Sequence, residues 1–212
     1  MIKKNKNIKD HTMNKHILVD CDGVLLDTLD SIQPFLKSIG LTVSEYEKNN
    51  MYADEYSCFQ DRSHAIKCFT AWQKNKSFSQ ITPLKGAVEN LKKLRSLSFK
   101  ISIITAAGHL DIAKQHRLQN LDNIFGKDFF ENIIYVDWTE SKNAALMKFS
   151  PTYFIEDVAI NAINALQTHH QPILIRNNQN KAKIEAHINQ LQNIIIIESW
   201  NEIFDIVTNN KK

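Results

Sequence analysis

The sequence lacks the features that define several classes of protein. It has only three cysteines, Cys21, Cys58 and Cys68, and no CxxC pair, which argues against a disulfide framework or a zinc site. No apolar run is long enough to cross a bilayer. The opening residues, MIKKNKNIKD, contain no apolar stretch of the kind that signal peptides need. We therefore expect a cytoplasmic protein with no membrane partner.

A large excess of charge is also missing. The formal net charge is +3, and lysines in residues 1–15 supply much of it, so we expect a basic, disordered tail there. Without a stripe of basic and aromatic side chains, nucleic acid is not the favoured partner. With 43% hydrophobic and 23% charged residues, the chain is typical of one globular domain with at most a small insert.

Short apolar, β-branched segments alternate with segments of helical spacing along most of the chain. The expected strands are 16–20, 100–105, 132–136, 152–156, 172–176 and 193–197. Continuous apolar strands separated by helices indicate a parallel sheet covered on both faces. The expected fold class is therefore α/β, a Rossmann-like doubly wound sheet, in which ligands bind beyond the carboxyl ends of the strands.

The alternation is interrupted between residues 28 and 81, where we expect no strand. Residues 31–40 and 62–74 have helical apolar spacing, with Pro34 in the first turn of the earlier helix, and Ser44 with Glu47 predicts a capping box. This segment is predicted to be a helical cap over the strand ends that decides the substrate. The expected domains are the tail at 1–15, the core at 16–27 and 82–212, and the cap at 28–81.

The sharpest signal for chemistry lies at the end of the first expected strand, in HILVDCDGVLLD. Asp20 and Asp22 are two positions apart, and Gly23 allows a tight turn after them. Two carboxylates this close repel each other unless a cation compensates, and Mg²⁺ takes such hard oxygen ligands. Asp20 can attack phosphorus to form an aspartyl-phosphate, while Asp22 protonates the leaving oxygen and then activates water. The alternative is a pair of turn aspartates that cap the next segment.

Three further strand ends supply groups that complement this pair. Thr105 ends the second expected strand, where its hydroxyl can hold a phosphoryl oxygen. Lys142 lies near the start of the helix after the third strand, where it can neutralise the nucleophile and the phosphoryl group. Lys148, about 9 Å further along that helix, is the rival. Glu156 and Asp157 end the fourth strand and are natural ligands for a hard cation, although one of them is also placed to cap the next helix.

In this order the motifs resemble those of the haloacid dehalogenase-like hydrolase superfamily, over nearly the whole chain. DCDGV is similar to the first motif, DxDx[TV], and IIT is similar to the second. Lys142 matches the lysine of the third motif, and Glu156 with Asp157 matches the acidic fourth. The resemblance implies a Rossmann-like core, a C1-type cap, and Mg²⁺ on Asp20, the backbone carbonyl of Asp22 and Asp157. Glu156 would act on the metal directly or through water.

Within this superfamily the second aspartate points to phosphoryl chemistry, because the haloalkanoate dehalogenases lack it. The segments FGKDFFENIIYVD, PTYFIED and ESWNEI are further similar to the 5′(3′)-deoxyribonucleotidase-like branch. This similarity implies a phosphatase for a small phosphorylated metabolite, with a nucleoside monophosphate as the leading substrate. A phosphomutase or phosphotransferase of the same superfamily, a nucleic-acid end phosphatase and a non-catalytic binding domain are the alternatives. The sequence leaves the oligomeric state open.

Overall fold

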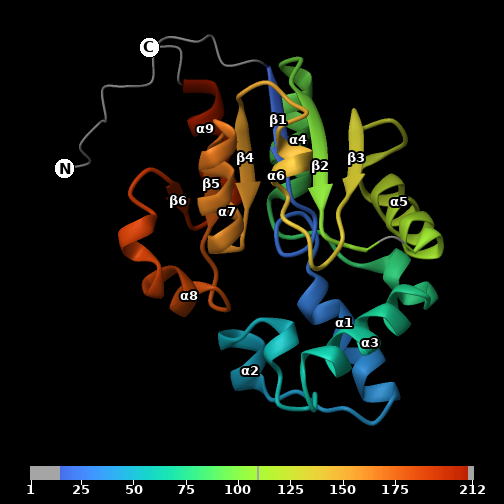
Figure 1. Ribbon diagram of the computed structural model, residues 1–212. Coiled ribbons are helices and arrows are strands. Elements are labelled where there is room, and N and C mark those ends of the chain that lie inside the picture. The colour runs from blue at the N-terminus through green and yellow to red at the C-terminus, as the bar shows by residue number, and fades with distance from the viewer. Residues whose placement is uncertain (1–14, 109, 210–212) are drawn as a thin grey trace.

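The computed structural model describes residues 15–108 and 110–209, so the predicted basic tail lies outside the described residues except for Lys15. One parallel sheet of six strands, in the order β3-β2-β1-β4-β5-β6, forms the centre of the molecule (Figure 1). The strands are β1 (His16–Val19), β2 (Lys100–Thr105), β3 (Asn132–Tyr135), β4 (Tyr153–Glu156), β5 (Gln171–Ile175) and β6 (Ile195–Ile197). The α/β class is confirmed, and all six strands lie within two residues of their expected bounds.

Both faces of this sheet are buried. Ile17 and Val19 of β1 belong to the largest hydrophobic core, which α4 and α9 complete, whereas Leu18 packs on the opposite face with Leu146 and Phe154. Burial on both faces explains why the strands are continuously apolar. The helices of the core are α4 (Ala87–Ser96), α5 (Asp111–Phe125), α6 (Asn143–Leu146), α7 (Ala159–Ala165), α8 (Lys181–Ala186) and α9 (Trp200–Asn209).

A helical insert separates β1 from β2 and lies beyond the carboxyl ends of the strands (Figure 1). It comprises α1 (Thr28–Ser38), α2 (Glu45–Asn50), η1 (Ala53–Glu55), α3 (Arg62–Gln73) and η2 (Lys76–Gln80). The expected start of its first helix at Ser31 is wrong by three residues. The helix begins earlier because the Asp27 side chain accepts a hydrogen bond from the Asp30 N–H and caps it, so Pro34 lies inside the helix rather than in its first turn.

The insert contacts the core on two sides. Gln73 of α3 is buried and donates a hydrogen bond from Nε2 to the carbonyl of Ala107, in the loop after β2, at 2.9 Å. On the other side, Gln179 in the loop after β5 donates to the carbonyl of Lys48 in α2 at 2.8 Å. These bonds hold the insert over the carboxyl edge of the sheet.

The predicted capping box at Ser44 and Glu47 is confirmed, and it also orders the loop that follows α2. The Glu47 carboxylate accepts hydrogen bonds from the Ser44 N–H at 2.9 Å and from the Ser57 N–H at 2.6 Å, and its side chain is nearly buried. These bonds, from Ser44 first and then Ser57, lower the pKa of Glu47 to about 2.

Replacing Glu47 with glutamine is expected to lower the free energy of unfolding by roughly 1–2 kcal/mol at neutral pH. Because the folded-state pKa lies below the unfolded value of 4.5, this stability is present above the unfolded pKa and is lost as the pH falls through about 2. Urea titrations should therefore show a large difference in the free energy of unfolding between the wild type and the variant at neutral pH, and a smaller difference near pH 3. A difference that does not depend on pH would contradict the assignment. Glu45→Gln, on the exposed face of α2, is the control.

Candidate active site

The carboxyl ends of four strands bring together five of the residues that the sequence predicts to act. Asp20 follows β1, Thr105 ends β2, Glu156 ends β4 and Asp157 follows it, while Lys142 caps α6 after β3. Because β1 pairs with β4 in the sheet, Asp20 lies beside Glu156 and Asp157. All five side chains are buried, which is what strand ends at the centre of a covered parallel sheet impose.

An ion-pair cluster centred on Lys142 lies at this edge. The Lys142 Nζ is 2.8 Å from Asp20 Oδ2 and 2.8 Å from Glu156 Oε2, and Asp20 Oδ1 accepts a hydrogen bond from the Cys21 N–H at 2.7 Å. Lys148, the rival of Lys142, is exposed and forms no ion pair with any residue that the structure describes. The geometry therefore places Lys142 in the cluster and Lys148 outside it.

Three carboxylates of this cluster have the arrangement of a cation site. Asp20, Glu156 and Asp157 each offer an oxygen, and the three oxygens lie within 4.8 Å of one another. Both oxygens of Glu156 are already engaged, Oε2 by Lys142 and Oε1 by the N–H groups of Asp157 and Val158. Asp157 Oδ1, in contrast, is buried without a hydrogen-bond partner among the described residues. Asp157 is therefore the acid with most capacity left for a cation.

Gly23 makes room for Asp157. Its φ is +74°, in the left-handed region, and a Cβ atom at this position would lie 2.2 Å from Asp157 Oδ2. The turn that the sequence predicts at Gly23 therefore requires glycine for two reasons: its backbone conformation and the close approach of the Asp157 carboxylate.

The electrostatics of the cluster favour an added positive charge. Burial raises the pKa of Asp20 to about 8, with the charge of Glu156 adding to the rise and Lys142 opposing it. Burial, then Glu156 and Asp20, raise the pKa of Asp157 well above its usual range. Burial alone would lower the pKa of Lys142, but the two carboxylates outweigh it and the net shift is upward. Three carboxylates thus share one ammonium group, and a hard divalent cation fits both the all-oxygen donors and the surplus negative charge.

Asp22 points its carboxylate to a different set of partners. Its Oδ1 accepts a hydrogen bond from Arg117 Nη2 at 2.6 Å and another from the Thr28 hydroxyl, and the side chain is 31% exposed. The side chain is not part of the three-acid group, so only the backbone carbonyl that the resemblance implies is left as a metal ligand from this residue. Sequence reasoning missed Arg117 and Thr28. The available signal was that Arg117 follows Ala113 by one helical turn, on the buried face of α5.

Thr105 has a fully buried hydroxyl with no hydrogen-bond partner in the described part of the chain. Buried hydroxyls are almost always paired, so an unpaired one at the edge of a ligand site is a group whose partner is expected to be the ligand. Its place at the end of β2 is the place that the sequence predicts for a phosphoryl-binding hydroxyl.

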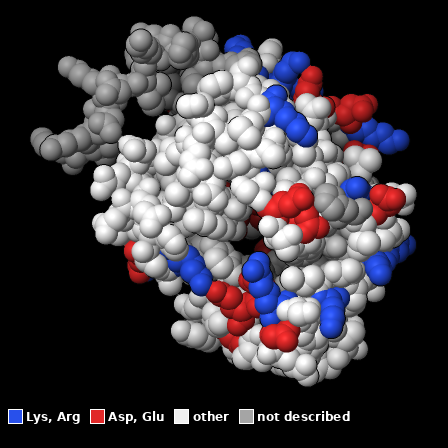
Figure 2. All heavy atoms as spheres, in the orientation of Figure 1, with Lys and Arg blue, Asp and Glu red and all other residues white. Residues whose placement is uncertain are grey.

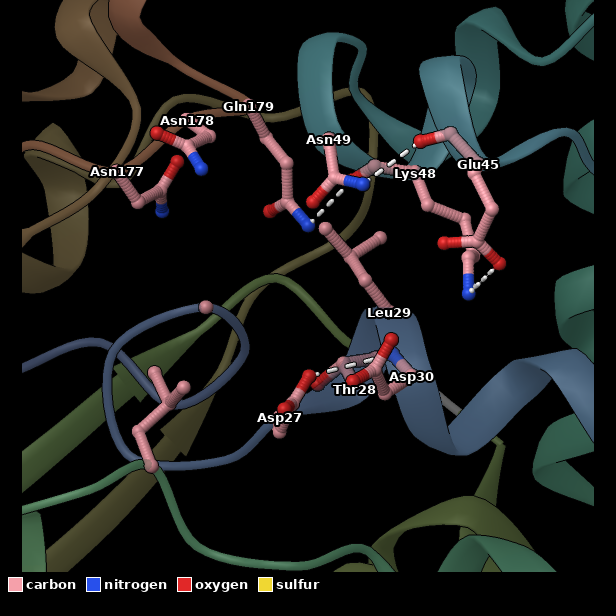
Figure 3. A pocket seen from close by; sticks show the side chains of 12 residues that line it. Asp27, Thr28, Leu29, Asp30, Glu45, Lys48, Asn49, Asn177, Asn178 and Gln179 are labelled. Atoms are coloured by element: carbon pink, nitrogen blue, oxygen red, sulfur yellow. Dashed lines mark hydrogen bonds and ion pairs between the residues drawn. The ribbon is translucent and has the colours of Figure 1, made fainter.

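A pocket of about 330 Å³ lies between the start of α1, α2 of the insert and the loop after β5 (Figure 3). Gly23, which abuts Asp157, is part of its wall. A hollow with acidic side chains in and beside it is visible on the face shown in Figure 2. The polar side chains that line the pocket are Asn49, Asn177, Asn178, Gln179, Asp27, Thr28, Asp30, Glu45 and Lys48. Lys48 is the one cation in this lining and is paired with Glu45 at 2.7 Å.

Comparison with known proteins identifies the family. Residues 14–212 match the family model described as 5′ nucleotidase, deoxy (pyrimidine), cytosolic type C protein. No curated protein sequence matches the chain. Among the described residues, no helix combines the length and the apolar character needed to span a membrane.

Solved structures of similar fold cover almost the whole chain. A predicted phosphatase from Clostridium acetobutylicum has a TM-score of 0.68 at 17% identity, covering 93% of this chain and 99% of its own. A haloacid dehalogenase-like hydrolase from Streptococcus pneumoniae has a TM-score of 0.69 at 18% identity, covering 92% and 99%. A hydrolase of the same superfamily from Deinococcus radiodurans, with phosphate and sodium bound, has a TM-score of 0.62 at 16% identity, covering 94% and 97%. At these identities the structures show the fold, and the family match shows the rest: the chain belongs to this 5′-nucleotidase family of the haloacid dehalogenase-like hydrolases and is a phosphatase.

Proposed function

We propose that the protein is a Mg²⁺-dependent phosphomonoester hydrolase that forms an aspartyl-phosphate on Asp20. The observation that carries the proposal is the placement of Asp20 at a strand end, 2.8 Å from the buried Lys142 and within the three-acid group. Asp20 attacks phosphorus while Asp22 protonates the leaving oxygen, and Asp22 then takes a proton from the water that hydrolyses the intermediate. Lys142 and the Thr105 hydroxyl stabilise charge on the phosphoryl oxygens.

The metal in this proposal is held by Asp20, Asp157 and the backbone carbonyl of Asp22. Glu156 acts indirectly, because both its oxygens already accept hydrogen bonds. The unpaired Asp157 Oδ1 and the space that Gly23 leaves beside Asp157 support a direct bond from this carboxylate. When bound, Mg²⁺ supplies the positive charge that lets an anionic ester approach an anionic nucleophile.

Replacing Asp157 with asparagine is expected to weaken Mg²⁺ binding by about 100-fold or more, since even residues that only orient a ligand change metal affinity by about 10- to 100-fold. In EDTA the variant should be at least as stable as the wild type, because it removes a buried carboxylate that Glu156 and Asp20 repel. Thermal unfolding across a Mg²⁺ titration measures both effects through the stabilisation that bound metal gives. An unchanged midpoint of this titration would contradict the assignment, and Asp122→Asn on α5 is the control.

The pocket beside the cluster supports a substrate with a neutral leaving group that forms many hydrogen bonds. Its four carboxamides, from Asn49, Asn177, Asn178 and Gln179, offer donors and acceptors of the kind that a nucleobase or sugar needs. Its three carboxylates outnumber its one lysine, which opposes a second phosphate such as a phosphomutase substrate carries. Together with the family description, this supports a nucleoside monophosphate as the substrate, with the helical insert acting as the cap that selects it. The cytosolic type named in that description supports a cytoplasmic location.

The test of the proposed function is phosphate release from a panel of monoesters with Mg²⁺ and with EDTA. The panel contains 5′- and 3′-nucleotides with pyrimidine and purine bases, with and without the 2′-hydroxyl, together with sugar monophosphates, a sugar bisphosphate and 4-nitrophenyl phosphate. We expect metal-dependent release that is fastest with a nucleoside monophosphate. Conversion of a sugar phosphate into its isomer without release would show a phosphomutase, and no reaction with any ester would refute the proposal.

A further inference from the structure

Arg117 is buried at a cost that folding does not explain. Its side chain has no exposed surface, and Nε and Nη1 have no hydrogen-bond partner among the described residues. Burying a guanidinium with unpaired nitrogens costs free energy, and an apolar side chain of similar length would suit this helix position better. The one polar contact of this guanidinium in the described part of the chain is the 2.6 Å hydrogen bond from Nη2 to Asp22 Oδ1.

The guanidinium is confined between Asp22 and the helical insert. Its central carbon lies 4.4 Å from the centroid of the Phe78 ring, in cation–π contact. Phe78 belongs to η2, the last element of the insert, and is itself buried edge-to-face against Trp72 at 5.0 Å. The Phe78 ring on one side and the Asp22 carboxylate on the other fix the position of the Arg117 guanidinium beside Asp22.

The hydrogen bonds to Asp22 distinguish its two oxygens. Arg117 and the Thr28 hydroxyl both donate to Oδ1, and no residue that the structure describes donates to Oδ2. In a protonated carboxyl group, the oxygen that accepts two donors is the carbonyl oxygen and the other carries the proton. This pattern makes Oδ2 the atom that holds the transferable proton.

We infer that Arg117 is a positioning residue for proton transfer by Asp22: it fixes the carboxyl group so that Oδ2 faces the transfer, and its charge stabilises the carboxylate that the transfer leaves. The inference rests on the proposed function. In the first step a bond forms between phosphorus and an Asp20 oxygen as the bond between phosphorus and the leaving oxygen breaks. The proton on Oδ2 moves to that leaving oxygen, so Asp22 changes from neutral to negative. A cation 2.6 Å away favours this change more than it favours the starting state.

The test compares two esters that differ in their need for a proton. The leaving alkoxide of a nucleotide must be protonated, whereas 4-nitrophenolate leaves without a proton. Arg117→Met is expected to lower kcat for the best nucleotide by about 30- to 100-fold, less than the roughly 10²- to 10⁴-fold that general acid catalysis contributes, because Asp22 itself remains. It should lower kcat for 4-nitrophenyl phosphate by less than about threefold. Asp22→Asn should lower kcat for both esters, because Asp22 also takes the proton from the water that hydrolyses the intermediate. Adding Arg117→Met to Asp22→Asn should change either rate little, because Arg117 acts through Asp22.

Two further variants separate positioning from folding. Arg117→Lys keeps the charge and should recover part of the nucleotide rate. If Arg117→Met does not fold, Arg117→Lys still tests the idea through a selective loss of about threefold to tenfold. Arg95→Met removes a guanidinium that lies 5.6 Å from the Phe129 ring, away from the site, and should leave the ratio of the two rates unchanged. Thermal unfolding of each variant gives its stability.

Equal losses with both esters in Arg117→Met, or fully additive losses in the double variant, would overturn the inference. Failure of the wild type to release phosphate from either ester would instead refute the proposed function, so the two failures are distinguishable.

Discussion

Asp20→Asn is expected to abolish turnover, with kcat reduced by about 10⁴-fold or more, as loss of a covalent nucleophile does elsewhere. The amide of asparagine is close in shape to the carboxylate but cannot attack phosphorus. Lys142 keeps its second partner, Glu156, at 2.8 Å in the variant, so the site should stay assembled. Phosphate release from the best nucleotide, with Mg²⁺ present, measures the effect.

The same substitution is expected to leave the metal-free protein at least as stable as the wild type. Asp20 is buried beside Glu156, and burial followed by that charge raises the pKa of its carboxyl to about 8, so a neutral side chain relieves desolvation and repulsion together. Thermal unfolding in EDTA tests this. Rapid acid quench with a phosphorus-labelled substrate should recover protein-bound phosphate, labile to hydroxylamine, from the wild type only.

Asp205→Asn, on the exposed face of α9, is the matched control and should retain the wild-type rate. If Asp20→Asn still turned over at a substantial fraction of the wild-type rate, or if it became labelled, Asp20 would not be the nucleophile. A large loss of stability in EDTA would show that the carboxylate serves folding rather than chemistry.

The sheet and the charged cluster could be predicted because both depend on local patterns. Strands buried on both faces are continuously apolar, so Ile17, Leu18 and Val19 reveal β1 without knowledge of its partners. Once the strands are parallel, their carboxyl ends meet at one edge, and Asp20 and Asp157 are neighbours by topology alone. The order of motifs along the chain therefore contained most of the site.

What the sequence did not reveal depends on contacts between distant segments. Arg117 and Asp22 are 95 positions apart. Helical spacing from Ala113 places Arg117 on the buried face of α5, but it does not identify Asp22 as the partner. The start of α1 was missed for a local reason, because the apolar spacing and Pro34 were used to place it at residue 31, whereas the Asp27 side chain caps the helix from Thr28. The engagement of both Glu156 oxygens depends on the path of the backbone after β4, which composition and spacing do not specify.

Lys142→Met is expected to reduce both stability and activity. The Lys142 side chain is 3% exposed, and its ammonium group lies 2.8 Å from each of two buried carboxylates. Its removal leaves Asp20 and Glu156 buried without a cation, which typically costs about 3–5 kcal/mol. In the proposed mechanism Lys142 also holds the nucleophile and stabilises phosphoryl charge, so kcat should fall by about 10²- to 10³-fold with Mg²⁺ present. Urea unfolding in EDTA and phosphate release measure the two effects.

Mg²⁺ distinguishes the electrostatic role of Lys142 from a packing role. A cation bound by Asp20 and Asp157, as proposed, would replace part of the missing charge, so saturating Mg²⁺ should stabilise Lys142→Met by more than it stabilises the wild type. A loss due only to packing would be the same with and without metal. Lys148→Met, which changes an exposed lysine in the same segment, should stay within about 0.5 kcal/mol of the wild type. If Lys142→Met matched the wild type in EDTA and kept its activity, the buried ion pairs would carry neither stability nor catalysis, and the assignment of Lys142 would be wrong.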